Sequence, residues 1–163
     1  MKPLKIVVIS DTHGDKGIIQ KIALQEYDAD YYFHLGDSEL FPNDIEPFVS
    51  VEGNRDYPGI YPKTRKIKTD YGSIFMEHGL KITSIGPNYA YAQDCLIYLF
   101  GHTHCHMVSN LDKNHYIANP GSLTRPRDGS SGTYLIITLE ENGPQFNFCL
   151  LYTSPSPRDP KTS

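Results

Sequence analysis

Leu4-Lys5-Ile6-Val7-Val8-Ile9-Ser10, followed at once by Asp11-Thr12-His13, is the stretch of this chain that decides the fold. Its apolar run is nearly continuous, which is typical of a strand covered on both faces of a sheet. Apolar residues at helical spacing follow in residues 15–27, so the first unit reads as strand, polar loop and helix. The stretch therefore predicts a central strand whose carboxyl end carries Asp11 and His13.

Four further polar clusters also close apolar runs, and each contains residues that can bind a metal ion. They are Gly36-Asp37, Gly53-Asn54-Arg55-Asp56, His78-Gly79 and Gly101-His102-Thr103-His104. Ligands of an open sheet gather beyond the carboxyl ends of its strands. Each cluster alone is also compatible with an ordinary turn or helix cap. Five clusters in this order favour a site for two divalent metal ions.

Strands and helices alternate in the first third of the chain, and hairpins dominate the last third. Besides the first strand, the pattern predicts strands at residues 31–35, 48–51, 64–69, 73–77, 96–100, 106–111, 115–118, 133–139 and 145–152. Besides the helix at 15–27, it predicts short helical segments at residues 42–47 and 88–95. This order predicts an α/β (α+β) fold in which a two-sheet β-sandwich is flanked by helices.

The length and composition predict one domain. With 163 residues, of which 39% are hydrophobic, the chain is long enough for one substantial core. We assign that domain to residues 1–152. Residues 153–163 contain three prolines and no large apolar side chain, so we expect a disordered Ser/Pro tail, and its abrupt composition leaves open that it is not native.

Charge and cysteine content limit the partners and the compartment. The net charge of −4 argues against binding of long nucleic acid, whereas a small phosphorylated substrate fits a site that contains metal ions. No run of about 18 apolar residues predicts a membrane helix. The three cysteines are widely spaced, which predicts reduced thiols and a cytoplasmic protein. The sequence leaves a homo-oligomer open.

The order and spacing of the five clusters resemble the calcineurin-like metallophosphoesterase superfamily, most closely its small YfcE-type phosphodiesterases. The resemblance extends from Lys5 to about Tyr152 and includes Asn119-Pro120-Gly121-Ser122 and Pro126-Arg127. It implies a metallophosphoesterase-like αββα sandwich, in agreement with the pattern of strands and helices. It also implies a hydrolase that cleaves phosphodiester bonds of a small substrate through a hydroxide bridging two divalent metals.

The same resemblance implies which residues hold the metals. The first ion would be bound by Asp11, His13 and His104, the second by Asn54, His78 and His102, and Asp37 would bridge the two. The implied metal is Mn²⁺, with Fe, Ni and Zn as alternatives. Two such ions, two carboxylates and a bridging hydroxide sum to a charge of about +1, which would attract a phosphate to this negatively charged protein.

The chain departs from the family pattern at Arg55, where many members carry a histidine that can protonate the leaving group. Arginine holds phosphate well but is a poor proton donor. We therefore expect Arg55 to bind substrate, next to the catalytic Asp37 and Asn54, and expect leaving groups that need little protonation. The alternative for Arg55 is an ion pair with Asp56 or another carboxylate. Arg127 is a second candidate for the substrate phosphate, against a solvated surface charge.

A structural role is expected for His34, and an alternative function is open for the protein. His34 lies inside an apolar strand, so we expect a packed core histidine. The turn Asn119-Pro120-Gly121-Ser122 could orient a ligand histidine or bind an anion through backbone N–H groups. The alternative function is a metal-binding scaffold for protein interactions, as in the subunit of the retromer complex that has this fold. The complete ligand set favours the enzyme.

Overall fold

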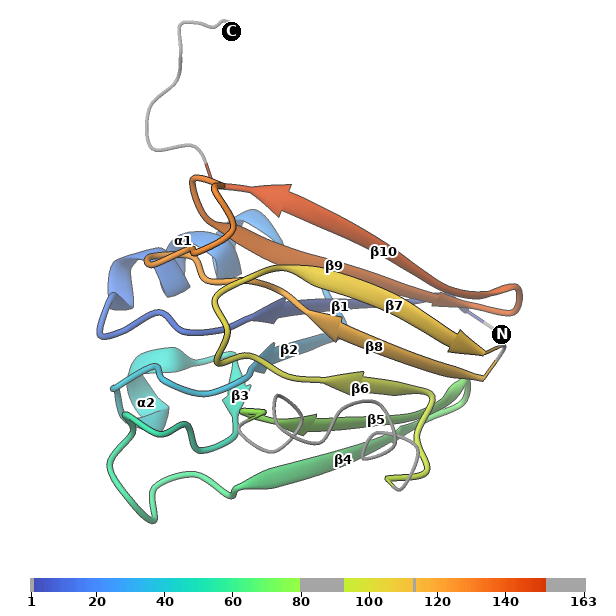
Figure 1. Cartoon of the computed structure of the whole chain (residues 1–163), viewed down its shortest axis with the longest axis horizontal. Helices are drawn as coiled ribbons and strands as arrows, with labels where there is room; N and C mark the ends of the chain where they lie inside the picture. The colour runs from blue at the N-terminus through green and yellow to red at the C-terminus, as the bar shows by residue number, and fades with distance from the viewer. Residues whose placement is uncertain (1, 80–92, 113, 152–163) are drawn as a thin grey trace, which may run out of the picture.

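Two five-stranded sheets make up most of the computed structural model, which describes residues 2–79, 93–112 and 114–151 (Figure 1). In chain order the elements are β1 (Leu4–Ile9), α1 (Lys16–Gln25), β2 (Tyr31–His34), α2 (Pro42–Ile45), β3 (Val49–Ser50), β4 (Thr64–Thr69), β5 (Gly72–Glu77), β6 (Ile97–Leu99), β7 (Met107–Asp112), β8 (His115–Asn119), β9 (Thr133–Glu140) and β10 (Gly143–Leu150). The strand order is β10-β9-β1-β2-β3 in the first sheet and β4-β5-β6-β8-β7 in the second.

Strand β1 is the centre of the first sheet. It pairs in parallel with β2 and antiparallel with β9. Successive side chains of a strand point to opposite faces. Ile6 and Val8 accordingly join the core shared with the second sheet, while Val7 and Ile9 join a separate core with the helices. All four side chains are fully buried, which explains the nearly continuous apolar run at this position.

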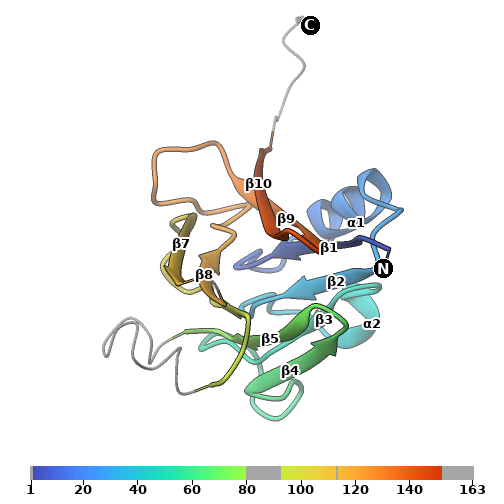
Figure 2. The same cartoon turned by 90° about the vertical axis from the view of Figure 1, so that its right-hand side faces the viewer.

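The two described helices cover the outer face of the first sheet. Asp15 caps the start of α1, because its Oδ1 accepts a hydrogen bond of 3.0 Å from the Ile18 N–H. Ile19 and Ile22 of α1 and Ile45 of α2 are buried in the core formed with β1. Figure 2 shows both helices on the same side of the sheet.

The second sheet has three parallel strands, β5, β6 and β8, between the antiparallel edge strands β4 and β7. Phe33 and Leu35 from the first sheet pack with Ile74, Met76 and Leu99 from the second. This shared core joins the sheets face to face. It also aligns the carboxyl ends of the parallel strands of both sheets at one end of the sandwich.

The predicted two-sheet sandwich with flanking helices is confirmed. The predicted strands and the two described helices agree with the structure to within two residues at each end. The helical segment predicted at residues 88–95 lies mostly outside the described residues, and so does the tail at 153–163. The domain boundary at residue 152 stays a prediction. Within the described residues, the helices are too short or too polar to span a bilayer.

Candidate metal centre

Loops that follow β1, β2, β5 and β6 meet at the end of the sandwich opposite the N-terminus (Figure 1). Within the first sheet, the Asp11 N–H donates to the Gly36 carbonyl at 3.0 Å. Within the second, the Gly101 N–H donates to the His78 carbonyl at 2.9 Å. Between the sheets, the His102 N–H donates to Asp11 Oδ2 at 3.2 Å. The loops therefore form one connected surface.

Asp11, His13 and His104 form a first group of candidate metal ligands. Asp11 Oδ1 lies 3.3 Å from His104 Nε2, and the Nε2 atoms of His13 and His104 are 3.4 Å apart. The side chains are almost completely buried. The structure thus brings together the three residues assigned to the first metal from the sequence.

Asp11, Asp37 and His78 form a second group. His78 Nε2 lies 3.3 Å from Asp37 Oδ2 and 3.8 Å from Asp11 Oδ1. The His102 ring stacks edge-on against His78, with ring centroids 5.2 Å apart, and Asn54 is exposed on the loop next to Asp37. Asp11 is the carboxylate common to both groups, although the sequence assigned the shared position to Asp37. Ligation and bridging stay predictions.

Two buried atoms of these groups have no hydrogen-bond partner among the described residues, Asp11 Oδ1 and His78 Nε2. Leaving one such atom buried and unpaired costs roughly 1–3 kcal/mol. A cation between them would satisfy both, since a carboxylate oxygen and an unprotonated imidazole nitrogen are metal ligands. The residues present therefore fit the divalent metals that the sequence predicts.

Backbone carbonyls orient two of the candidate ligand histidines. His78 Nδ1 lies 2.8 Å from the Leu35 carbonyl oxygen, and His104 Nδ1 lies 2.7 Å from the Arg125 carbonyl oxygen. A carbonyl oxygen can only accept, so each Nδ1 carries the hydrogen. Each ring is then held with Nε2 turned toward the centre, the arrangement usual for metal-binding histidines.

Glu39 contacts a third candidate ligand histidine, His13, and sequence reasoning missed this contact. Its Oε2 lies 2.6 Å from His13 Nδ1, which leaves His13 Nε2 facing His104. The sequence signal was present in the position of Glu39, a carboxylate two residues after Asp37 in the same loop. A loop glutamate is ordinarily a solvated charge, so the contact with His13 was visible only in three dimensions.

The backbone is strained at this end of the molecule. Of the seven non-glycine residues with positive φ in the described part of the chain, six lie in these loops. They are Asp11, His13, Asp37, Glu39, His102 and His104. Each such residue costs roughly 1–3 kcal/mol, and strain of this kind concentrates at functional sites. The strain is independent support for a functional site here.

Glycines before two of the candidate ligands allow the loops to approach closely. A Cβ atom on Gly53 would lie 2.2 Å from Asp37 Oδ1. A Cβ atom on Gly101 would lie 2.2 Å from Ser10 Oγ and 2.8 Å from Asp11 Oδ2. Only glycine fits at these two positions without displacing a carboxylate of the centre.

Asp56 is a buried carboxylate that joins two loops of the centre. Its oxygens accept hydrogen bonds from the backbone N–H groups of Asp37 (2.8 Å), Glu39 (2.8 Å) and Gly53 (2.7 Å). The ion pair between Arg55 and Asp56, considered as an alternative from the sequence, is absent from the described structure. Asp56 instead holds the backbone on both sides of the candidate metal ligands.

The candidate substrate residues Arg55 and Arg127 are both exposed. The Arg55 N–H donates to Asp37 Oδ1 at 2.7 Å, and the Arg127 N–H donates to the His104 carbonyl at 2.8 Å. Within the described residues, neither guanidinium group forms an ion pair with a carboxylate. The backbones of both arginines therefore lie next to the centre, and their exposed side chains are available to bind an anion.

His34 is fully buried beneath the centre, which confirms the packed histidine expected from the sequence. The Gly36 N–H donates to its Nδ1 at 3.1 Å, so a neutral ring carries its hydrogen on Nε2, which lies 3.0 Å from Thr12 Oγ1. Burial lowers the pKa of His34 to about 4. A neutral His34 thus links the loops that follow β1 and β2.

The turn at Asn119-Pro120-Gly121-Ser122 supports the centre through side chains. Asn119 Nδ2 donates to the Gly101 carbonyl and to Thr103 Oγ1, each at 3.0 Å. Ser122 Oγ donates to the Asp11 carbonyl at 2.8 Å. The expected backbone N–H contacts to a ligand histidine are not found among the described residues, where a carbonyl further along the same loop holds His104.

The metal-free centre stabilises charged forms of its buried groups. Burial alone lowers the pKa of His78, but the neighbouring carboxylates of Asp37 and Asp11 outweigh it and raise that pKa. Burial alone raises the pKa of Asp37, but His78 and the Arg55 N–H outweigh it and lower that pKa. A metal ion held by His78 Nε2 would therefore require that His78 lose this proton.

Comparison with known proteins relates this arrangement to phosphoesterases. A family model of the calcineurin-like phosphoesterase superfamily domain matches residues 4–142. The chain is 32% identical over 156 residues to the probable metallophosphoesterase YsnB of Bacillus subtilis (strain 168), with 89% of this chain and 90% of that protein covered.

Solved structures share the fold. A conserved protein of Streptococcus pneumoniae TIGR4, described as a predicted phosphoesterase, superposes with a TM-score of 0.83 at 28% identity, covering 92% of this chain and 91% of that one. The phosphoesterase YfcE of E. coli gives 0.63 at 20% identity, with 85% and 89% covered. Vps29 of Entamoeba histolytica with bound zinc gives 0.64 at 17% identity, with 90% and 99% covered. The last two similarities show the fold alone.

Proposed function

Because the chain belongs to the calcineurin-like phosphoesterase superfamily, we propose that it is a metal-dependent phosphoesterase that cleaves phosphodiester bonds of a small substrate at two divalent metal ions. The observation that carries the proposal is the pair of buried atoms that lack a hydrogen-bond partner among the described residues, Asp11 Oδ1 and His78 Nε2, each within a group of candidate ligands. Mixed carboxylate and imidazole ligands suit transition metals, and Mn²⁺ is the ion we propose.

The ligands would divide between the ions as the sequence suggests, with Asp11, His13 and His104 on one side and Asn54, His78 and His102 on the other. Asp37 would lie between them. When bound, two such ions activate a water molecule and neutralise the phosphoryl oxygens. The protein holds the histidine rings through their Nδ1 atoms and keeps both carboxylates buried, so the ligands are positioned before any ion arrives.

Arg55 would bind the substrate phosphate, and Arg127 is the second candidate. Arg55 follows Asn54, and its backbone N–H donates to Asp37 Oδ1, so the residue lies next to the carboxylate proposed as catalytic. Its lack of an ion pair within the described residues leaves it available to a phosphate. Because arginine stays protonated, Arg55 orients the phosphate but does not supply a proton to the leaving group.

The decisive experiment compares metal-stripped protein before and after addition of Mn²⁺, with bis-p-nitrophenyl phosphate and the corresponding monoester as substrates. We expect Mn²⁺-dependent hydrolysis with preference for the diester. Asp37→Asn should lose this activity. Turnover of neither ester would contradict the proposed activity, and undiminished activity of Asp37→Asn would contradict the role of Asp37.

A series of aryl phosphate diesters tests the role of Arg55 in the same assay. Without a proton donor, the rate should fall steeply as the pKa of the leaving phenol rises. A rate that does not depend on this pKa would show that another group protonates the leaving oxygen.

The alternative is a metal-binding scaffold for protein interactions with little turnover. Vps29 shares the fold at 17% identity, which carries no functional argument. Metal binding without hydrolysis of either ester would favour the scaffold.

The three cysteines Cys95, Cys105 and Cys149 are free thiols, which supports a reducing compartment, and we propose the cytoplasm.

A further inference from the structure

One candidate ligand histidine of the centre, His13, differs from His78 and His104 in the group that holds its ring. His78 and His104 donate from Nδ1 to neutral backbone carbonyls, whereas His13 faces a carboxylate oxygen of Glu39 at 2.6 Å. The contact joins two loops that are 26 positions apart in the chain. The pair therefore depends on the fold and adds a negative charge on one side of the centre only.

Glu39 is held in place for this contact. Its φ is +59°, a conformation that side chains other than glycine rarely adopt. The Glu39 N–H donates to Asp56 Oδ1 at 2.8 Å, and Asp56 is itself buried. The His13 side chain is only 5% exposed, whereas that of Glu39 is 31% exposed, so the ring is buried and the carboxylate that faces it keeps some contact with water. An unconstrained surface glutamate would lack this backbone anchor.

We infer that Glu39 is a positioning residue for His13 and selectively raises the affinity of the metal site formed by Asp11, His13 and His104. The inference rests on the proposed function, because it assumes that this group of side chains binds a metal ion. A carboxylate behind a ligand imidazole fixes the ring with Nε2 toward the metal and places negative charge near the cation. At the other site, the Leu35 carbonyl holds the ring of His78 and adds no such charge.

The experiment titrates Co²⁺ into the metal-free full chain and follows visible absorption and calorimetry. Glu39→Gln keeps the size of the side chain and an oxygen that can accept from His13 Nδ1, but removes the charge. We expect this variant to bind one of two Co²⁺ ions about 10–100-fold more weakly than the wild type, with the other unchanged. Equal affinities for both ions in variant and wild type would overturn the inference.

Two background variants identify the site that changes. Asn54→Ala lacks a proposed ligand of the second site. In this background, Glu39→Gln should still lower the affinity for the remaining tightly bound Co²⁺ ion by about 10–100-fold. In His104→Ala, which lacks a ligand of the first site, Glu39→Gln should have no effect on the remaining ion. An equal effect of Glu39→Gln in both backgrounds would overturn the selectivity.

A matched control separates positioning from general stability. Glu140→Gln makes the same chemical change at the far end of β9 and should leave both affinities unchanged. The melting temperature of metal-free Glu39→Gln should equal that of metal-free wild type, and a large fall would assign Glu39 a structural role instead. Wild type that binds two Co²⁺ ions but hydrolyses no ester would refute the proposed function alone. Wild type that binds no Co²⁺ would refute both.

Discussion

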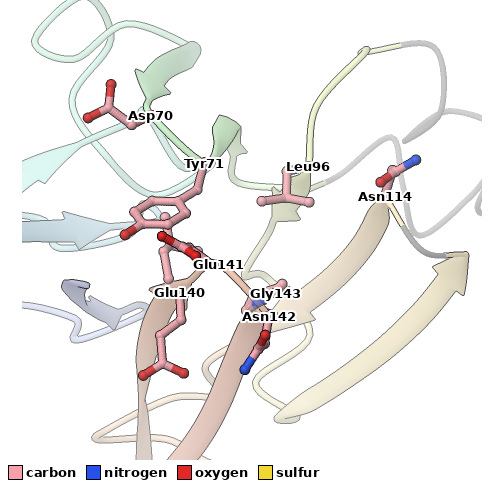
Figure 3. A pocket seen from close by; sticks show the side chains of 10 residues that line it. Asp70, Tyr71, Leu96, Asn114, Glu140, Glu141, Asn142 and Gly143 are labelled. Atoms are coloured by element: carbon pink, nitrogen blue, oxygen red, sulfur yellow. The ribbon is translucent and has the colours of Figure 1, made fainter. Parts of the chain in front are cut away.

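At the end of the sandwich opposite the metal centre, the carboxylates of Asp70, Glu140 and Glu141 line a pocket of about 400 Å³ (Figure 3). Both ends of the protein are therefore acidic, but they are built differently. In the pocket the carboxylates extend from hairpin turns, and those of Asp70 and Glu140 point in opposite directions in Figure 3. At the centre, Asp11 and Asp37 are buried and converge with histidines.

The direction of the strands explains this difference. The carboxyl ends of β1, β2, β3, β5, β6 and β8 all point to the centre, so the loops that follow these strands meet there, and ligands of open sheets gather at such ends. Turns at the other end join neighbouring antiparallel strands and leave their polar groups in water. Among the described residues, the groups of three candidate ligands within 4.8 Å of one another both lie at the centre. Acidic residues alone do not make a metal site.

Metal addition should give the largest contrast between the two ends. At a free Mn²⁺ concentration about 100 times the dissociation constant, each bound ion stabilises the fold by about 2.7 kcal/mol, or about 5 kcal/mol for two. The melting temperature should then rise by roughly 10–20 °C, as measured by calorimetry. Glu140→Gln in the pocket should keep this rise and Asp37→Asn should lose most of it. The same rise in both variants would break the contrast.

Acid should destabilise the metal-free protein through His34, a buried histidine at the centre. Burial lowers the pKa of folded His34 to about 4, from 6.5. Its contribution to stability is complete above pH 6.5 and is lost as the pH falls toward 4, because the unfolded chain takes up a proton that the folded ring resists. The loss is about 3 kcal/mol.

Urea unfolding between pH 7.5 and 4 measures this effect. The free energy of unfolding of His34→Gln should fall less over this range than that of the wild type, by about 3 kcal/mol. Between pH 7.5 and 9 the difference between the two proteins should stay constant, which serves as an internal control. Parallel curves down to pH 4 would mean that His34 does not titrate as its burial requires.

Replacing a glycine by alanine at each end should give the smallest expected difference between the centre and the pocket. Gly53→Ala forces Cβ toward Asp37 Oδ1, and displacement of a catalytic group by about 1 Å costs about 100-fold in rate. Gly143→Ala, in the turn at the pocket, also has a positive φ, but its Cβ would meet only Tyr116 Oη at 3.9 Å. It should lose about 1–2 kcal/mol of stability and no activity per folded molecule. Equal rates for the two variants in the diesterase assay would refute the close approach of Gly53 to Asp37.

Much of the fold could be predicted because its signals are local. The apolar run of β1 and the helical spacing of the apolar residues in α1 each specify an element within a few residues. The candidate ligands could be identified for the same reason, since each lies in the loop that follows a strand. The contacts of Asp56 and Glu39 could not be predicted. Asp56 accepts hydrogen bonds from backbone groups of a loop distant in sequence, and Glu39 contacts a histidine 26 positions away.

The charge of the site is a second property that the sequence alone could not predict. The sequence count of about +1 included two carboxylates and omitted Glu39. If two divalent ions bind as proposed, Glu39 against His13 would lower the count to about zero, and attraction of a phosphate would then depend more on Arg55 and Arg127, the proposed substrate residues. A charge contributes according to its distance from the site, and sequence separation does not measure that distance.

By itself the sequence determined the two-sheet sandwich, the strands that end at the centre and the residue types available there, because periodicity and turn residues act over short stretches of chain. Only the tertiary structure decided that Asp11 belongs to both ligand groups, that Asp56 holds three backbone N–H groups and that Glu39 faces His13. These contacts join loops from different strands, and their distances exist only after the sheets have packed. The physical reason is that hydrogen bonds and charge interactions depend on ångström distances that burial fixes.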